Sequence, residues 1–202
     1  MSRISRNELL YEGCYAHVIS RSIRKMRVFA EDEDFDQFKK LLLIAKKAGG
    51  FAIYHYCLMQ THFHLAVRMG RPDMFSIAMR DLKRSYVYWY HAKNKISGPL
   101  WRGRYRSLLI EDENYLFTCG KYIESNPVKA GLVASSELWG HGSARYYING
   151  IEDDLLDRYE KDVKQKEDLS LTEEEFEKGT VIGSSFFRFQ FYDSRRRVQR
   201  VP

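Results

Sequence analysis

Cysteine and proline are both scarce in this sequence of 202 residues, which contains three cysteines and four prolines. The cysteines, Cys14, Cys57 and Cys119, are odd in number, lie far apart and include no Cys-x-x-Cys pair. This spacing indicates neither a disulfide framework nor a thiolate zinc site. We expect each cysteine to be a small buried apolar residue.

Long hydrophobic runs are also missing. No apolar run approaches the length of about 20 residues that a membrane-spanning helix needs, and no apolar segment follows the first residues. We therefore expect a cytoplasmic protein without a membrane partner. The chain is long enough to bury one sizeable core and to carry an appended segment.

Positive charge is concentrated in the first three quarters of the chain. Residues 1–150 hold 23 Lys and Arg against 14 Asp and Glu, residues 151–180 hold 5 against 12, and residues 181–202 hold 5 against 1. A basic body with an acidic segment and a basic tail is typical of a nucleic-acid-binding protein. A highly charged solvated surface is the alternative, since a net charge of +6 is compatible with both.

The order of strand and helix patterns predicts the fold. Apolar alternation predicts strands over 14–20, 51–59, 63–69 and 100–110. Helical spacing predicts helices from Asp34 to Gly49, from Pro72 to Asn94 and from Asp112 to Asn126, with Asp34 and Asp112 as the capping residues of the first and third. This order predicts an α+β, ferredoxin-like fold, an antiparallel sheet with helices on one face. The helix after the fourth strand has no place in that pattern. We assign 1–150 to one domain and 151–202 to a C-terminal extension with an acidic segment of helical period and a basic tail.

Two histidines lie two residues apart in the third predicted strand. Residues 59–67 read Met-Gln-Thr-His-Phe-His-Leu-Ala-Val. Because side chains alternate along a strand, His62 and His64 share one face, about 6 to 7 Å apart along the backbone. Two imidazoles at that spacing can bind one divalent cation. A chance pair on a half-exposed strand is the other interpretation of the spacing alone.

Arginine recurs in the segment over 100–110. If this segment is extended, Arg102, Arg104 and Arg106 lie on one face and Trp101 and Tyr105 on the other, a basic ridge beside aromatic rings. Such a ridge suits phosphate oxygens, although arginine on an edge strand also keeps that edge soluble. Arg80, Lys83 and Arg84 lie off the apolar stripe of the second predicted helix and are expected to face solvent or a ligand.

The third predicted helix carries two stripes. Leu116, Cys119 and Ile123 form an inward apolar stripe, while Tyr122 and Asn126 share another face, one turn apart. By themselves these residues suggest packing for Tyr122, one of 14 tyrosines, and a helix end for Asn126, because Pro127 disfavours continuation of the helix.

These segments together resemble a known superfamily. Residues 59–67 resemble the HUH motif of single-tyrosine transposases, and residues 121–133, Lys-Tyr-Ile-Glu-Ser-Asn-Pro-Val-Lys-Ala-Gly-Leu-Val, resemble the segment that carries their nucleophile. The similarity extends to Arg21, residues 82–83 and residues 98–105. The Tyr-Ile-x-x-Asn-Pro-Val form is most similar to the REP-associated tyrosine transposases. Gln60 and Thr61 depart from the Pro-Asn that commonly precedes the first histidine in the family.

The resemblance implies a function in DNA recombination and transposition. It implies a metal-dependent endonuclease and strand transferase that cleaves and rejoins single-stranded DNA bearing a hairpin, with Tyr122 as the nucleophile that forms a 5′-phosphotyrosine. His62, His64 and Asn126 would bind Mg²⁺ or Mn²⁺. We expect a monomer rather than a homodimer. The expected DNA contacts are Arg21, Lys83, Arg102, Arg104, Arg106, Lys121, Arg195, Arg196 and Arg197.

Two other functions stay open at the level of sequence. One is a catalytically silent DNA-binding protein that recognises palindromic hairpins. The other is a metal-dependent hydrolase of a small substrate, in which Tyr122 would be dispensable. The basic residues from Arg102 to Arg106 disfavour the second alternative.

Overall fold

The computed structural model describes residues 9–159, 180–185, 187–188 and 190–191. Within them, one sheet contains the strands β1 (Tyr15–Arg21), β2 (Ala52–Met59), β3 (His62–Arg68), β4 (Arg106–Ile110) and β5 (Val181–Ile182). The sheet is accompanied by the helices α2 (Asp32–Gly49), α3 (Pro72–Asn94), α4 (Glu113–Lys129) and α5 (Ala144–Asn149), and by the 3₁₀ helices η1 (Ile23–Lys25) and η2 (Ser136–Leu138).

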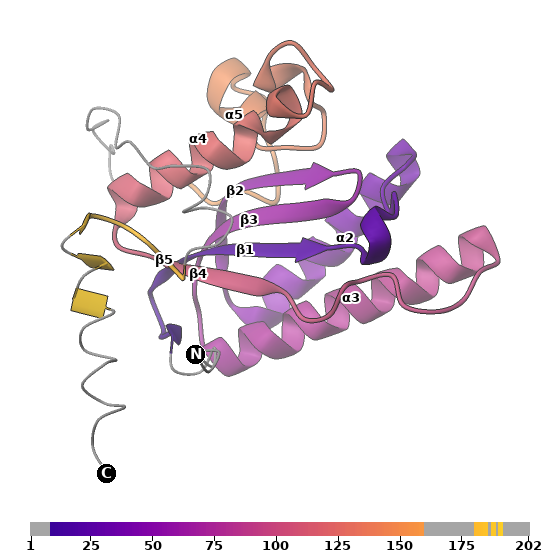
Figure 1. Cartoon of the computed structure of the whole chain (residues 1–202), viewed down its shortest axis with the longest axis horizontal. Helices are drawn as coiled ribbons and strands as arrows, with labels where there is room; N and C mark the ends of the chain where they lie inside the picture. Colours follow the sequence, from indigo (N-terminus) through magenta and orange to yellow (C-terminus); the bar gives the residue numbers. More distant parts are fainter. Residues whose placement is uncertain (1–8, 160–179, 186, 189, 192–202) are drawn as a thin grey trace.

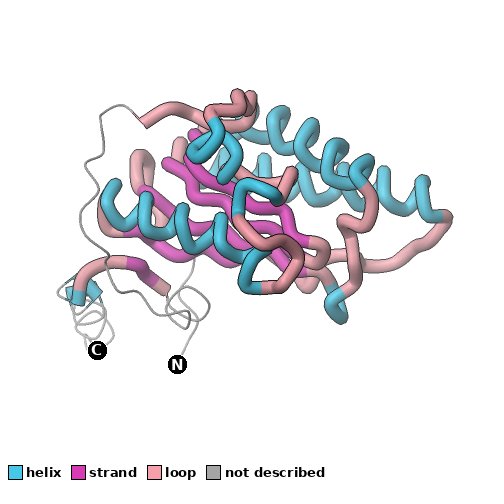
Figure 2. Tube along the Cα trace, turned by 90° about the horizontal axis from the view of Figure 1, so that it is seen from above, coloured by secondary structure: helices cyan, strands magenta, loops and turns pink. Residues whose placement is uncertain are grey.

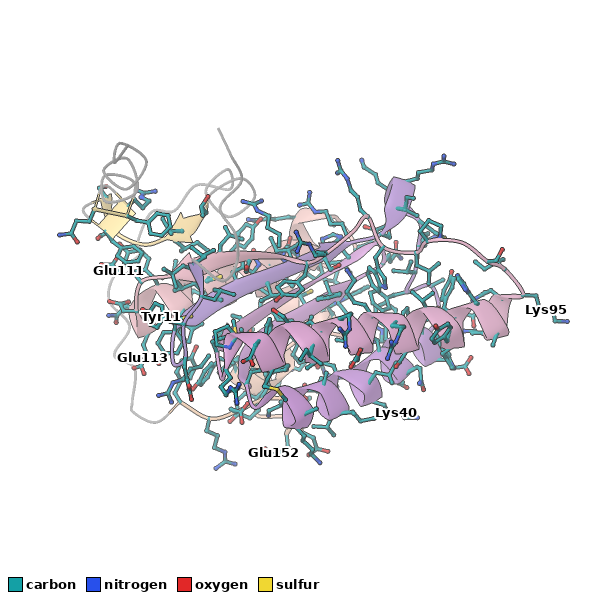
Figure 3. The ribbon with its side chains drawn as sticks, turned by 90° about the horizontal axis from the view of Figure 1, so that it is seen from below. Tyr11, Lys40, Lys95, Glu111, Glu113 and Glu152 are labelled. Atoms are coloured by element: carbon teal, nitrogen blue, oxygen red, sulfur yellow. The ribbon has the colours of Figure 1, made fainter. Side chains whose placement is uncertain are left out.

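The strands lie in the order β2-β3-β1-β4-β5, and the first four are antiparallel neighbours. Among these four, β1 and β3 are the central strands, and α2 and β2 lie between them in sequence, as in a ferredoxin-like sheet. The predicted fold class is therefore confirmed. β5 pairs in parallel with β4, so residues 181–182 of the extension join the same sheet. Next to β5, Glu111 accepts hydrogen bonds from the backbone N–H and the hydroxyl of Ser184 (Figure 3).

Helices cover both faces of the sheet (Figure 1). The α2 and α3 pair packs on one face around Phe38, Phe63 and Tyr86, which are fully buried. Figure 3 looks onto this pair, with Lys40 on α2 and Lys95 at the C-terminal end of α3. The predicted packing on one face therefore holds for these two helices.

α4 lies on the opposite face, where it contacts β2, β3 and β1 (Figures 1 and 2). Its predicted inward stripe of Leu116, Cys119 and Ile123 is fully buried in a second core. The central strands can support two cores because they are buried on both faces; β3, for example, is buried from Phe63 to Val67. All three cysteines are buried and unpaired, as predicted.

One of the two predicted N-cap residues is confirmed and the other is wrong. Asp112 is the N-cap of α4, as predicted, and accepts hydrogen bonds from the backbone N–H groups of Asn114 and Tyr115. Asp34, however, is not the N-cap of α2. Glu31 takes that position, and Asp34 lies in the first turn, where its carboxylate accepts hydrogen bonds from the N–H groups of Ala30 and Glu31.

The predicted end of α4 at Asn126 was wrong, because the helix continues through Pro127 to Lys129. A proline removes the N–H that would bind the carbonyl four residues earlier, here that of Ile123. The Nδ2 of Asn126 donates to that carbonyl at 3.1 Å and to the Tyr122 carbonyl at 2.9 Å. The asparagine side chain thus supplies the donor that Pro127 lacks.

The predicted strand over 100–110 is shorter than expected. Only Arg106–Ile110 forms β4, since Gly103 has a φ of +128°, which interrupts the extended backbone. Trp101 and Tyr105 are both buried in the core under α3 rather than open for base stacking, whereas Arg102 and Arg104 are exposed.

The described part of the acidic segment is not helical. Residues 151–159 form turns and irregular backbone, in which Leu155 joins the core under α2 and α3. Residues 160–179 lie outside the described residues. No described helix has the length and apolar character that crossing a membrane requires.

Candidate nuclease site

The predicted histidine pair lies at one end of β3, on the face that α4 covers. The ring centroids of His62 and His64 are 4.9 Å apart. His62 is half-buried and its Nδ1 lies 2.9 Å from the hydroxyl oxygen of Thr61, whereas His64 is buried with 2% of its surface exposed. His64 therefore lies inside the layer between the sheet and α4, and His62 lies at the edge of that layer.

A third histidine, which the sequence did not single out, stands beside the pair. His17 is fully buried on β1, and its Nε2 lies 2.9 Å from the Nδ1 of His64. The sequence placed His17 in a strand, but only the pairing of β1 with β3 brings it to His64.

Burial keeps both inner imidazoles neutral. Burial, reinforced by the positive charges of Arg106 and Arg21, lowers the pKa of His17 from 6.5 to about 3. Burial also holds the pKa of His64 well below its usual value, and His17, His62 and Arg21 act in the same direction. A neutral imidazole has a lone pair for a cation or a proton, which an imidazolium lacks.

One nitrogen atom of the histidine cluster is suited to bind a divalent cation. Among the described residues, the buried Nε2 of His64 has no hydrogen-bond partner. Such an atom, on a neutral ring and next to the ring of His62, is suited to ligate a metal. The described residues contain no group of three or more His, Cys, Asp or Glu side chains placed to hold a metal ion.

Tyr122 is brought to the histidines by α4. Its ring centroid lies 6.2 Å from that of His17 and 6.4 Å from that of His64, and 8% of its surface is exposed. The Nζ of Lys129 lies 4.3 Å from the centroid of the same ring. The phenol thus stands between a neutral histidine cluster and a lysine.

Asn126 follows Tyr122 by one turn and is half-buried. Its two described hydrogen bonds, to the Tyr122 and Ile123 carbonyls, use Nδ2. Because Nδ2 is directed at the helix backbone, Oδ1 is the amide atom available to a ligand.

A buried polar cluster under α4 was also missed from the sequence. The Oε1 of Glu124 lies 2.8 Å from the Nδ1 of His55 on β2 and 2.6 Å from the hydroxyl oxygen of Ser143. The Nε2 of His55 lies 2.6 Å from the Tyr159 hydroxyl. No sequence signal marks this cluster, because its members come from four separate segments.

Cationic side chains lie on β1, on α4 and on the segment that leads into β4. Arg21 pairs with His62 across β1 and β3, and the N–H of Arg102 donates to the Arg21 carbonyl at 2.9 Å. Arg102, Arg104, Arg21 and Lys121 are exposed, and Arg106 is half-buried. These positions suit contact with a polyanion. Arg195, Arg196 and Arg197 lie outside the described residues.

The expectation that Lys83 lies on an exposed face of its helix was wrong. Only 8% of its surface is exposed, and its Nζ donates to the Gly103 carbonyl at 2.6 Å and lies 5.3 Å from the Trp101 ring centroid. Lys83 faces the loop before β4 because that loop packs on α3.

Comparison of solved structures finds a similar fold. A REP-associated tyrosine transposase bound to a REP hairpin matches with a TM-score of 0.62 and 19% identity, covering 85% of this chain and 100% of that one. A Deinococcus radiodurans R1 structure, described as a putative transposase, is 21% identical with a TM-score of 0.41, covering 62% of this chain and 97% of that one.

Sequence comparison identifies the family. None of the curated proteins compared with the chain matches it. The model of the IS200-like transposases matches residues 10–126, which include the histidine pair, Tyr122 and Asn126. The match spans more than half of the chain, from β1 into α4. The chain therefore belongs to the IS200-like transposase family, within the HUH single-tyrosine transposases.

Proposed function

We propose that this transposase cleaves and rejoins single-stranded, hairpin-bearing DNA, with Tyr122 as the nucleophile. The observation that carries the proposal is the 6.4 Å separation between the ring centroids of Tyr122 and His64. One buried phenol lies beside neutral imidazoles, next to a surface of exposed arginines. This combination suits attack on a phosphodiester.

His62, His64 and the Oδ1 of Asn126 would hold Mg²⁺ or Mn²⁺. When bound, such an ion polarises the phosphate and neutralises developing negative charge. The uncharged ligands would leave the full charge of the ion available. The partnerless Nε2 of His64 is the feature of this chain that supports the assignment.

The cleavage step exchanges one phosphate ester for another. The Tyr122 oxygen attacks phosphorus, its proton passes to solvent, and the 3′ oxygen of the preceding nucleotide leaves and is protonated. The products are a 5′-phosphotyrosine and a free 3′-OH. Attack by a 3′-OH on this ester rejoins the strand and releases Tyr122, so no nucleotide cofactor is needed. The ammonium group of Lys129 lies over the ring of this nucleophile, 4.3 Å from the ring centroid.

Arg21, Arg102, Arg104, Arg106 and Lys121 would contact the DNA backbone, with Arg195, Arg196 and Arg197 of the tail. Phosphate contacts of this kind orient DNA without reading its sequence. A hairpin substrate is supported by the hairpin bound to the solved REP-associated protein. We assign catalysis to residues 1–150 of a cytoplasmic monomer, with 151–202 as an extension.

The test is a covalent adduct on end-labelled, single-stranded hairpin DNA with Mn²⁺, resolved on a denaturing gel. Tyr122→Phe and a chelator should each abolish the adduct. Tyr90→Phe is the matched control, because Tyr90 is also 8% exposed but lies on α3, on the face of the sheet opposite α4 and Tyr122. Hairpin binding without an adduct, across varied hairpins and metals, would instead support a catalytically silent binding protein.

A further inference from the structure

We propose that His55 and Glu124 are positioning residues that fix α4, and hence Tyr122, on the sheet. The inference rests on the proposed role of Tyr122. We call the group formed by His55, Gly120, Glu124, Ser143 and Tyr159 the helix seat. It is separate from the histidine pair and includes residues beyond the family match, which ends at residue 126.

The polar contacts of the helix seat are buried and directional. The side chains of His55 and Glu124 are 2% and 11% exposed. A carboxylate only accepts hydrogen bonds, so the Nδ1–H of His55 and the hydroxyl of Ser143 both donate to Glu124. Two short bonds to one oxygen hold Glu124 at a defined point above β2.

A close contact between Gly120 and His55 sets the distance of α4 from the sheet. A Cβ added to Gly120 would lie 2.3 Å from the Nε2 of His55 and 2.4 Å from two carbons of its ring. Only a glycine allows α4 to approach the imidazole at this point. Gly120 and Glu124 are one turn apart, so both face the same ring.

These two contacts flank the proposed nucleophile. Gly120 comes two residues before Tyr122 and Glu124 two residues after it, which corresponds to about 3 Å along the axis on each side. A movement of α4 at the helix seat would therefore move the Tyr122 ring relative to His64. A displacement of about 1 Å from the reacting geometry can reduce a rate on the order of 100-fold.

The segment after α4 holds the imidazole from its other side. The Tyr159 hydroxyl binds the Nε2 of His55, and the Tyr147 ring stacks on His55 at 4.5 Å between centroids. The Tyr147 hydroxyl donates to the Tyr54 carbonyl at 2.6 Å. Residues 143–159 thus fix the ring against which the nucleophile helix rests.

The experiment compares Glu124→Ala with Glu124→Gln in the full-length chain. We would measure single-turnover adduct formation at saturating hairpin DNA, hairpin affinity, thermal stability, and hydrogen exchange over residues 113–129. Lys93→Met is the matched control. Like the Glu124 variants, it breaks a contact made by a buried carboxylate, here that of Asp34, but in the α2 and α3 layer.

If Glu124 is a positioning residue, Glu124→Ala should lower the rate of adduct formation about 10- to 100-fold and leave hairpin affinity unchanged. It also speeds exchange in α4, while Lys93→Met does neither. Glu124→Gln restores most of the rate, because its amide oxygen can accept the same hydrogen bonds. An equal loss of rate in Glu124→Ala and Glu124→Gln would indicate that the charge of Glu124 matters and would overturn the proposal. A Glu124→Ala variant with the wild-type rate would also overturn it.

Hydrogen exchange separates failure of this inference from failure of the proposed function. If wild-type protein forms no adduct across varied hairpins and metals, the proposed function fails, and exchange in α4 still reports whether Glu124 fixes the helix. If wild-type protein forms the adduct and Glu124→Ala leaves both the rate and α4 exchange unchanged, only the helix seat is refuted.

Discussion

The Nε2 of His17 lies 2.9 Å from the Nδ1 of His64, and the two rings are stacked with centroids 5.1 Å apart. One nitrogen must donate and the other accept. If His64 donates from Nδ1, its Nε2 carries the lone pair that a metal needs. His17 would then act as the acceptor that selects this tautomer, as partners of metal-ligating histidines commonly do.

The first prediction concerns this hydrogen bond. His17→Phe should weaken Mn²⁺ binding about 10- to 100-fold, because His64 loses the acceptor that orients it. His17→Gln should retain part of the affinity through its amide oxygen. Titration calorimetry with Mn²⁺ measures the effect, with His91→Phe on α3 as a control. Unchanged affinity in His17→Phe would show that His64 needs no such partner.

The second prediction separates two roles of Asn126. Asn126→Ala should destabilise the fold by about 1 to 2 kcal/mol, because the Ile123 carbonyl loses its amide donor beside Pro127. Adding Pro127→Ala supplies a backbone N–H and should restore stability in urea unfolding. The double variant should still form no adduct, since the proposed metal ligand is missing. Recovery of the adduct would refute that ligand role.

The third prediction tests the close approach of α4 to β2. Gly120→Ala should cost about 1 to 3 kcal/mol in the free energy of unfolding, because the new methyl group would overlap the His55 ring. Gly140→Ala is the control, since the nearest atom to its added Cβ is 3.8 Å away. Equal stability of the two variants in denaturant would mean that the His55 ring moves aside freely.

The fourth prediction distinguishes an exposed arginine from a buried lysine. Arg104→Ala should weaken hairpin binding and reduce the slope of log affinity against log salt by about one. Lys83→Met should leave that slope unchanged but lower thermal stability, because Lys83 holds the Gly103 carbonyl. A reduced slope in folded Lys83→Met would restore the lysine as a DNA contact.

The fifth prediction is a pH dependence of stability. Burial, with Lys39 nearby, lowers the pKa of His141 below 6.5 and outweighs the ion pair with exposed Asp32. Between the lowered pKa and 6.5 the unfolded chain binds the proton and the folded chain does not. The contribution of His141 is therefore complete above pH 6.5 and declines as the pH falls.

Urea unfolding at pH 7.5 and pH 5.0 measures this dependence. The fall in stability between the two should be smaller in His141→Gln than in wild type. His141→Gln also loses the stacking of His141 on Phe35. This loss is the same at both pH values, so it cancels when each protein is compared with itself. An identical fall in both proteins would contradict the assignment.

The sequence by itself determined the elements and their order. Alternating and helical spacings are local, so they predicted β1 to β4, the span of α3 and the ferredoxin-like topology. The ordered residues from His62 to Asn126 sufficed to indicate the family. Local rules failed where a side chain changed the outcome, as at Pro127, whose missing N–H Asn126 replaces.

Only the tertiary structure decided which distant groups meet. The pairing of β1 with β3 brings His17 to His64, and the packing of α4 on the second face brings Tyr122 to both and Glu124 to His55. The burial of Lys83 likewise depends on the loop at Gly103. These contacts join segments far apart in the chain, so no local periodicity specifies them. They arise when apolar faces pack and the buried polar groups must find partners.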